Sequence, residues 1–500
     1  MVVNEIKLMD KIRNGICSFL RIQPAQPHTI YINERLDRVS NAIKNRIWYR
    51  GDSDELAEMY RQLDSDRSKF WAAVPTTGME IRKLHTGLPA IIVNRLADIV
   101  MTDMNDIKVP PAWQDVWKKI AEENSFSDLI KEAVTETLTV GDGAFKISFD
   151  TSISAFPIVE FVPGDAVELE RQRGRLRAVR FKTVYTHEGR HYSLIETYGH
   201  GFIESVLYRG EQEVPLTAIP QTAKLARRVE YGGDFCMAVP LQFFPSTKWK
   251  GRGKSVFDDK CDAFDALDEC WSQWLDALRK GRTKEYIPEN MLPKNPHTGE
   301  IMQPNPFDNA YIQCAANMAE GANQRIETVQ PGIPVESYLG TYITALDLCL
   351  QGLISPSTLG IDTKKLDNAE AQREKEKTTL YTRGAIIDAL QTVIPKVINV
   401  IGKAYDTFYQ RPVCDMADKV EVPFGEYANP SFESQVETCG KARQFGLMSV
   451  ETMLDELHGD TRTAEWKAQE AARIKAEQGL IGMGDEPSLG QELGGLIGSI

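Results

Sequence analysis

The stretch SVFDDKCDAFDALDECWSQWLDALRKG (Ser255–Gly281) carries the clearest structural pattern in the chain. Ser255 is a suitable helix N-cap, and Asp258 follows three residues later, where it can interact with the first turn and its dipole. Basic residues followed by Gly281 are typical of a helix C-terminus. The stretch therefore predicts one long amphipathic helix, whose apolar residues recur at helical spacing: Phe257, Cys261, Phe264, Leu267, Trp271, Trp274 and Leu278.

A second helix is predicted at residues 335–353, because apolar residues from Val335 to Leu353 again form one stripe. The intervening segment, Glu285 to Pro334, is rich in proline. It nevertheless contains strand-like runs at 311–314 and 325–329, so we expect a small module rather than a linker. The two helices should therefore be antiparallel, leading to this module and returning from it.

Working outward toward the N-terminus, helical patterns cover residues 33–45, 54–63, 89–100 and 126–138. In the first of them, Leu36, Val39 and Ile43 mark the apolar side. The turn signal Gly141-Asp142-Gly143 follows. Six short β-type runs then predict a β-meander of hairpins, at 144–149, 157–162, 166–170, 176–185, 191–198 and 202–208.

Beyond the second helix, residues 355–366 form a predicted loop. A long helical pattern then runs from Asp367 or Asn368 to about Tyr409, and Pro395 is expected to kink or split it. A short strand at 419–424 and helices at 432–445, 450–457 and 463–478 follow. The Gly-rich tail from Gly479 is expected to be disordered. The whole pattern predicts an α+β fold.

Composition excludes several classes of protein. The 500 residues carry 58 Lys and Arg against 71 Asp and Glu, a formal net charge of -13. This balance argues against a protein that grips nucleic acid over its whole surface, but not against local DNA contact. No run of about 18 apolar residues is present, so no membrane span is expected. The first ten residues lack the apolar run of a signal peptide, which favours a cytosolic product.

Catalytic and metal-binding signatures are weak. Gly251-Arg-Gly253-Lys254-Ser255 ends like a phosphate-binding loop, but Lys248 stands where that motif needs its first Gly. A glycine hinge followed by a helix N-cap is the simpler interpretation. The eight Cys form no C-x-x-C pair, and His187, His191 and His200 lack accompanying ligands at metal spacing. We expect neither a metal, a cofactor nor an enzymatic activity.

Charged residues suggest two possible contact surfaces. Asp258, Asp262, Asp265 and Glu269 fall on one stripe of the first long helix. This stripe is either a solvated face or a surface toward a confined negative partner or a neighbouring subunit's basic residues. Basic density is expected to be highest at Thr363-Lys364-Lys365 and at Arg373, Lys375 and Lys377.

Several motifs together resemble the portal, or head–tail connector, proteins of tailed bacteriophages, of the long-tailed type. The resemblance spans roughly residues 47–457 and depends on the order and spacing of motifs that are individually weak. These are Trp48-Tyr49-Arg50-Gly51, the junction Leu138–Ile147, Gly253-x-Ser255-x-Phe257, Leu359-Gly360-Ile361-Asp362 with Asn368-Ala369 and Gln372–Glu376, and Gly446-Leu447-Met448-Ser449-x-Glu451-Thr452.

The resemblance implies a portal-like division of the chain. The wing would comprise residues 1–254, followed by the first stem helix at 255–280, the clip at 281–334 and the second stem helix at 335–354. A tunnel loop would cover 355–368, and 369–429 would supply a long kinked helix and a return strand of the wing. Crown helices would occupy 430–478, ahead of the disordered tail at 479–500.

The resemblance further implies a homo-oligomeric ring, usually dodecameric, around a channel for double-stranded DNA at one capsid vertex of the virion. During assembly the protein would be in the host cytoplasm. The terminase packaging motor, a head-completion or tail adaptor, and the major capsid and scaffolding proteins would be its partners, with no membrane involved. Asp362, Thr363, Lys364 and Lys365 would lie in the tunnel loop, where the two lysines could form a collar that touches DNA transiently.

In this hypothesis the protein guides DNA passively and a separate ATPase drives it. An acidic wall repels phosphates, so DNA can slide without sticking. Two alternatives remain open from the sequence. One is a nucleotide-binding enzyme that uses Gly253-Lys254-Ser255. The other is a virion or scaffolding protein that oligomerises without a channel.

Overall fold

The computed structural model describes residues 36–63, 69–74, 81–288, 291–292, 294–300, 311–314, 326–361, 369–416, 418–425, 432–458 and 463–477. Within them the chain has the predicted α+β fold, with helices and mainly antiparallel sheets in separate stretches of sequence. It divides into two units, one formed by residues 1–100 and 107–422, the other by 101–106 and 423–500.

The N-terminal helices are α2 (Arg38–Arg50), α3 (Ser53–Leu63), α4 (Leu88–Thr102), α5 (Pro111–Glu123) and α6 (Phe126–Val140). All but α5 are predicted from the sequence. The expected apolar side of α2 is wrong: Val39 and Ile43 are 43 % and 49 % exposed, whereas Asn41 and Asn45 are buried. The reason is that both asparagine side chains donate hydrogen bonds to the carboxylate of Asp258.

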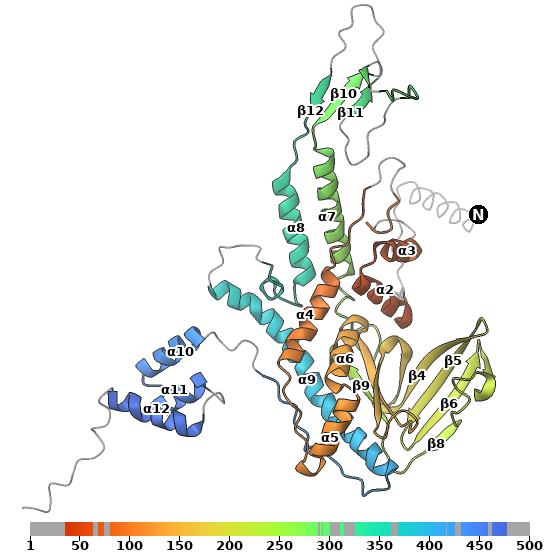
Figure 1. Cartoon of the computed structure of the whole chain (residues 1–500), viewed down its shortest axis with the longest axis vertical. Coiled ribbons are helices and arrows are strands. Elements are labelled where there is room, and N and C mark those ends of the chain that lie inside the picture. Colours follow the sequence, from red (N-terminus) through yellow and green to blue (C-terminus); the bar gives the residue numbers. More distant parts are fainter. Residues whose placement is uncertain are drawn as a thin grey trace, which may run out of the picture. The chain divides into compact units, whose positions relative to one another are not determined.

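The predicted meander is confirmed, but its strands belong to two sheets. β1 (Asp142–Ser148) lies between β2 (Ile158–Pro163) and β9 (Ala238–Gln242). The second sheet has the order β3-β4-β5-β6-β7, with β8 (Arg228–Glu230) paired to β6 (Figure 1). Its other strands are β3 (Val167–Gln172), β4 (Arg175–His187), β5 (Arg190–Gly199), β6 (Phe202–Arg209) and β7 (Gln212–Val214).

The long helix α9 (Ala369–Phe408) continues through Pro395 without being split. It packs against β1 and β9 and buries one side of its C-terminal part, including Ile386, Leu390 and Ile394. Residues 376–408 are long and apolar enough to cross a membrane by length and composition, contrary to the sequence expectation. Within the most apolar stretch of this helix, 44 % is buried inside the fold.

The predicted pair of long helices is α7 (Cys261–Lys280) and α8 (Val335–Leu350). The helix α7 begins five residues later than expected, because residues 256–260 form turns. Ser255 still caps this segment, since its Oγ accepts from the Phe257 N–H and its own N–H donates to Asp258.

The module between the helices is a small sheet of order β11-β10-β12, in agreement with the two predicted strands. It comprises β10 (Lys284–Pro288), β11 (Tyr311–Cys314) and β12 (Glu327–Val329). The strand β10 is parallel to β11 and antiparallel to β12. Figure 1 shows this sheet where α7 ends and α8 begins.

The expected strand at 419–424 is reduced to two isolated bridges, Lys108 with Glu421 and Met104 with Phe424. The predicted C-terminal helices are confirmed as α10 (Phe432–Gln444), α11 (Val450–His458) and α12 (Ala464–Glu477). Val450 and Leu454 of α11 pack against Ala471 of α12 and form a small core. The tail from Gly479 lies outside the described residues.

Candidate functional site

The helical hairpin α7–α8 is the feature on which the predicted function depends, and its base is tied closely to the sheets. Gly253 and Gly141 approach so closely that a Cβ built on Gly253 would come within 1.9 Å of the Gly141 carbonyl oxygen. The Val256 N–H also donates to the Leu138 carbonyl over 3.0 Å. The end of α6 and the lead into α7 therefore meet backbone to backbone, which requires glycine at both positions.

The phosphate-loop-like segment has no free cradle of backbone donors. The N–H of Gly253 donates to Asp142 over 2.8 Å, and that of Lys254 donates to the Phe244 carbonyl over 2.8 Å. The N–H of Ser255 is held by Asp258, and the Lys254 ammonium pairs with Asp259. A phosphate needs such N–H groups to point outward together. The segment is thus a structural joint between the sheets and the lead into α7. This favours the interpretation of the motif as a glycine hinge followed by a helix N-cap, rather than as a phosphate-binding loop.

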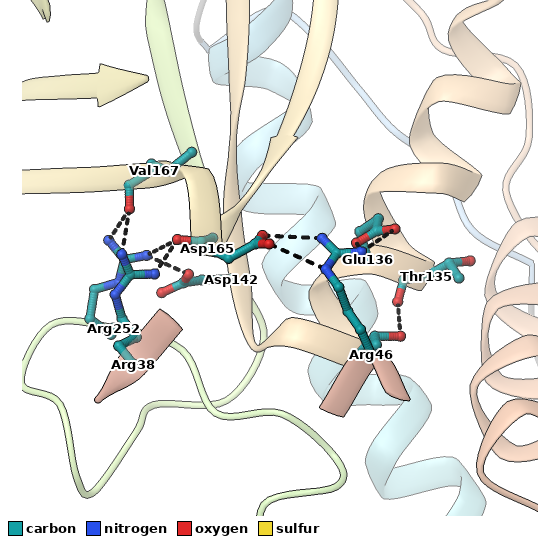
Figure 2. A network of polar contacts seen from close by, with 10 residues as sticks. Arg38, Arg46, Thr135, Glu136, Asp142, Asp165, Val167 and Arg252 are labelled. Carbon is teal, nitrogen blue, oxygen red and sulfur yellow. Dashed lines mark hydrogen bonds and ion pairs between the residues drawn. The ribbon is translucent and has the colours of Figure 1, made fainter. Parts of the chain in front are cut away.

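A buried polar network surrounds this joint (Figure 2). Arg252 donates to Asp142 over 2.7 Å, and also to the carbonyls of Gly164 and Val167. Arg38 of α2 reaches the same two carbonyls, so two guanidinium groups lie side by side. Burial, and then the charge of Arg252, lower the pKa of Arg38. The network joins α2, β1, β3 and the lead into α7.

Arg46 extends the network toward α6. Its guanidinium contacts Asp165 at 3.1 Å and Glu136 at 2.9 Å (Figure 2). Burial opposes the charged form of Arg46, but these two carboxylates outweigh it and raise its pKa. None of these arginines is among the site residues predicted from the sequence, because their partners are distant along the chain.

The four acidic residues of the predicted stripe do not share one solvent-exposed face. Asp265 is 5 % exposed and accepts from the N–H groups of Phe70 and Trp71, at 3.0 and 3.2 Å. Asp258 precedes α7 and holds the asparagines of α2. Only Asp262, which pairs with Lys69, and the half-buried Glu269 remain turned toward solvent. Burial raises the pKa of Asp265, against the effect of the two backbone donors.

Asp268, which is not among the site residues predicted from the sequence, accepts more hydrogen bonds than the other carboxylates described for α7. It is completely buried and accepts from Trp71 Nε1, Thr86 N and Thr86 Oγ1, at 3.2, 2.9 and 3.0 Å. His85 Nδ1 lies 2.7 Å from Asp268 Oδ2. Asp265 and Asp268 therefore fasten the segments around Trp71 and His85 to the first half of α7.

Aromatic rings hold the second half of α7 against α8. Trp274 stacks on Tyr338 with 8° between the ring planes, and Trp271 packs against Tyr342. Lys260 Nζ donates to the Leu348 carbonyl near the other end of α8. These pairings run in opposite directions along the two helices, which confirms the antiparallel arrangement.

The helix α8 is only partly covered within the described chain. Its buried side chains are confined to the C-terminal end, at Ala345, Leu346, Cys349 and Leu350. Val335, Leu339 and Leu348 are 48 %, 45 % and 52 % exposed. Val335 and Leu339 are one helical turn apart, so they share one side of α8 and together expose a small apolar surface.

The remaining predicted site residues are less informative. Asp362, Thr363, Lys364 and Lys365 lie outside the described residues. Among the described residues, no group of three or more His, Cys, Asp or Glu side chains is arranged to hold a metal ion. His200 lies 3.2 Å from Asp234, and His191 contacts Thr186.

The expectation that basic residues are densest at 363–377 is wrong. Residues 171–182 (RQRGRLRAVRFK) contain six basic residues in twelve positions, more than the five in fifteen at 363–377. They form the β3–β4 hairpin, whose tip is Arg173-Gly174. The alternation of arginine along this stretch was the signal in the sequence that could have revealed it.

Comparisons with known proteins give only distant structural likenesses. No family model matches the chain. No curated protein matches it either. Solved structures that resemble it include "Virion of native gene transfer agent (GTA) particle", with 14% identity, a TM-score of 0.36, and 72% of this chain and 85% of that chain covered.

Two further structures are "Neck of native GTA particle computed with C12 symmetry" and "Neck of empty GTA particle computed with C6 symmetry". Their identities are 11% and 12% and their TM-scores 0.38 and 0.35, and each comparison covers 74% of this chain and 89% of that chain. At these values the likenesses carry no inference about the role of this chain.

Proposed function

We propose that this chain is the subunit of a phage-type portal, a homo-oligomeric ring through which double-stranded DNA passes during packaging and ejection. The antiparallel hairpin α7–α8 supports this proposal, because it carries a small separate sheet between two stem-like helices. In the proposal, that sheet is the clip, which docks the terminase packaging motor and later a tail adaptor. The helices α10–α12 are the crown, and the N-terminal helices with the two larger sheets are the wing.

The exposed apolar side chains of α8 are the observation that carries the oligomeric part of the proposal. Val335 and Leu339 lie one helical turn apart and are each nearly half exposed. Removing apolar surface from water is favourable by about 25 cal/mol per Å². A neighbouring subunit would cover this surface in a ring, since the described part of the chain does not.

The proposed mechanism is passive guidance of a polyanion. Of the predicted stripe, Asp262, which pairs with Lys69, and Glu269 face solvent and would repel phosphates, whereas Asp258 and Asp265 serve the internal architecture. Lys364 and Lys365 would supply a weak, salt-screened collar in the tunnel loop. The ring would stand at a capsid vertex and contact the major capsid and scaffolding proteins.

Negative-stain microscopy of the purified chain tests the ring directly. We expect closed rings with a central hole, with twelve subunits as the expected number. The double variant V335D/L339D should remain monomeric, because two carboxylates would be buried at each subunit contact. Ile153→Asp is the matched control, since Ile153 is 73 % exposed and lies outside the hairpin. Rings formed equally well by the double variant would overturn the role given to α8.

The collar is tested separately with the variant K364E/K365E. Ring assembly should be unchanged, whereas packaging or retention of DNA should fall. Particles filled normally with DNA by this variant would contradict the collar while leaving the ring intact.

The two alternatives predict different results. A virion or scaffolding protein without a channel would form assemblies that lack the central hole. The nucleotide-binding alternative is not favoured, because the N–H groups of Gly253, Lys254 and Ser255 are already occupied.

A further inference from the structure

The β3–β4 hairpin presents a concentrated positive surface on an otherwise acidic chain. Arg171, Arg173, Arg175 and Arg177 are all exposed and surround the two-residue turn at Arg173-Gly174. We name Arg171, Arg173 and Arg175 the arginine tip. The net charge of the chain is -13, so this local positive density is not a reflection of overall composition.

The arginine tip is distinguished from its neighbours by the absence of counter-charges. Arg180 pairs with Glu170 at 3.2 Å, and Arg177 lies 3.8 Å from the same carboxylate. Within the described residues, no ion pair or side-chain hydrogen bond involves Arg171, Arg173 or Arg175. Three unneutralised guanidinium groups thus remain at the end of the hairpin.

The turn holds the arginine tip in place. Arg173 and Gly174 have φ values of 51° and 81°, as required for a two-residue turn that matches the twist of the strands. Gln172 pairs with Arg175 across it, and a bulge follows Glu170. A rigid hairpin loses little conformational freedom when it binds, so its charged groups are already arranged for a ligand.

A neighbouring loop extends the positive surface. Arg171 lies over Gly251, where an added Cβ would come within 3.3 Å of the Arg171 Cδ. Lys250, one residue earlier, is exposed, and Lys248 of the same loop is exposed as well. Two separate segments of the chain therefore bring basic side chains to one place.

The chemistry of this surface favours a phosphate backbone over a protein partner. Leu176 is the single apolar residue between Arg171 and Arg177, and both it and Trp249 of the neighbouring loop are half-buried, so the tip offers no fully exposed aromatic or aliphatic anchor. Protein–protein interfaces depend on such anchors. Guanidinium groups bind phosphate through paired hydrogen bonds and need no apolar surface to do so.

We propose that the arginine tip, with Lys250 beside it, is a sequence-independent binding site for the phosphate backbone of duplex DNA. This site is distinct from the tunnel loop, and it depends on the hairpin alone rather than on a ring. Arginines two residues apart on a strand are spaced by about 7 Å, so neighbouring members of the tip can reach different phosphates. The contact should be weak and strongly dependent on salt.

Fluorescence anisotropy with a labelled 30-base-pair duplex of arbitrary sequence tests the proposal, at NaCl concentrations from 50 to 200 mM. The full chain should bind the duplex at 50 mM NaCl. In R171A/R173A/R175A the affinity should fall at least about tenfold, and the slope of log affinity against log salt should become shallower by about 2 to 3. Its melting temperature should match that of the unmodified chain, because the three side chains are exposed.

The control R209A/R227A/R228A removes the same charge from β6, from β8 and from the residue before β8, where Arg227 and Arg228 pair with glutamates. Its binding should remain close to that of the unmodified chain. Likewise, adding R171A/R173A/R175A to K364E/K365E should weaken duplex binding as much as it does in the unmodified chain. This result would separate the arginine tip from the proposed collar.

Three results would overturn the proposal. The first is no duplex binding at 50 mM NaCl. The second is an equal loss of binding in the tip variant and in its control. The third is arginine-dependent binding of polyglutamate without binding of DNA, which would assign the surface to an acidic protein.

Discussion

Arg252 donates a hydrogen bond to Asp142 over 2.7 Å, and both side chains are at least nine-tenths buried. Asp142 begins β1, whereas Arg252 lies in the lead into α7, so this ion pair joins the sheet to the base of the helical hairpin. Breaking one side of such a pair leaves an uncompensated charge in the interior. The loss of either partner should therefore lower the free energy of unfolding.

Replacing Arg252 by methionine should lower the free energy of unfolding of the larger unit by about 3–5 kcal/mol, because Asp142 would be buried without its partner. Urea denaturation followed by tryptophan fluorescence measures this change. Arg228→Met is the control: it breaks an exposed pair with Glu230 and should cost at most about 1 kcal/mol. Equal effects of the two substitutions would contradict the role of the buried pair.

Replacing Asp268 by alanine should loosen the segments around Trp71 and Thr86, because Trp71 Nε1, both Thr86 donors and His85 would lose their acceptor. Loss of several charge-assisted hydrogen bonds should cost about 3 kcal/mol or more. Hydrogen exchange should show faster exchange of the Thr86 amide, while exchange in α11 stays unchanged. Asp262→Ala, on the exposed side of α7, is the comparison that should leave Thr86 protected.

The titration of Asp265 should make stability depend on pH. Burial raises its pKa in the folded state above 3.8, so the folded state binds the proton more tightly than the unfolded state. The stabilisation that comes from this tighter proton binding is fully present below pH 3.8, the ordinary pKa of an aspartic acid. It is lost as the pH rises through the pKa of Asp265 in the folded state. Relative to Asp265→Asn, the unmodified chain should therefore gain stability as pH falls through this window.

Comparing Asp265→Asn with Asp265→Ala separates two effects. Both substitutions remove the titration, but only alanine also removes the acceptor for the Phe70 and Trp71 amides. The alanine variant should be the less stable of the two at every pH. Parallel pH profiles for the unmodified chain and both variants would refute the assignment.

The stacking of Trp274 on Tyr338 should stabilise the hairpin. Trp274→Ala should destabilise it by about 2–4 kcal/mol, through lost burial and lost ring contact. Trp274→Phe should cost much less, because the indole N–H of Trp274 is buried without a hydrogen-bond partner in the described structure. Hydrogen exchange of the α8 amides around Tyr338 is the measurement, and similar protection in all three proteins would contradict the prediction.

Magnesium–ATP should not stabilise the protein. The donors of the segment Gly253–Ser255 are occupied, so a millimolar concentration of nucleotide should leave the melting temperature unchanged. A rise in melting temperature that disappears in Lys254→Ala would restore the nucleotide-binding alternative.

Local patterns in the sequence predicted most helices, the meander, and the two strands of the small sheet, because periodicity reflects burial on one face. They failed where a distant partner decides burial. Asn41 lies inside because of Asp258, which is 217 residues away, and Asp268 is buried because of Trp71 and Thr86. The apparent acidic stripe failed for the same reason: helical spacing shows which side chains share a face, but not what that face meets.

The contact between Gly141 and Gly253 has a mechanical consequence. Because the two backbones touch here, no side chain separates the end of α6 from the lead into α7. A force along α7 would be transmitted to the sheets through this backbone contact, rather than being absorbed by changes of side-chain rotamer. Any side chain larger than hydrogen at either position would force the two backbones apart and change the tilt of the helical hairpin relative to the sheets.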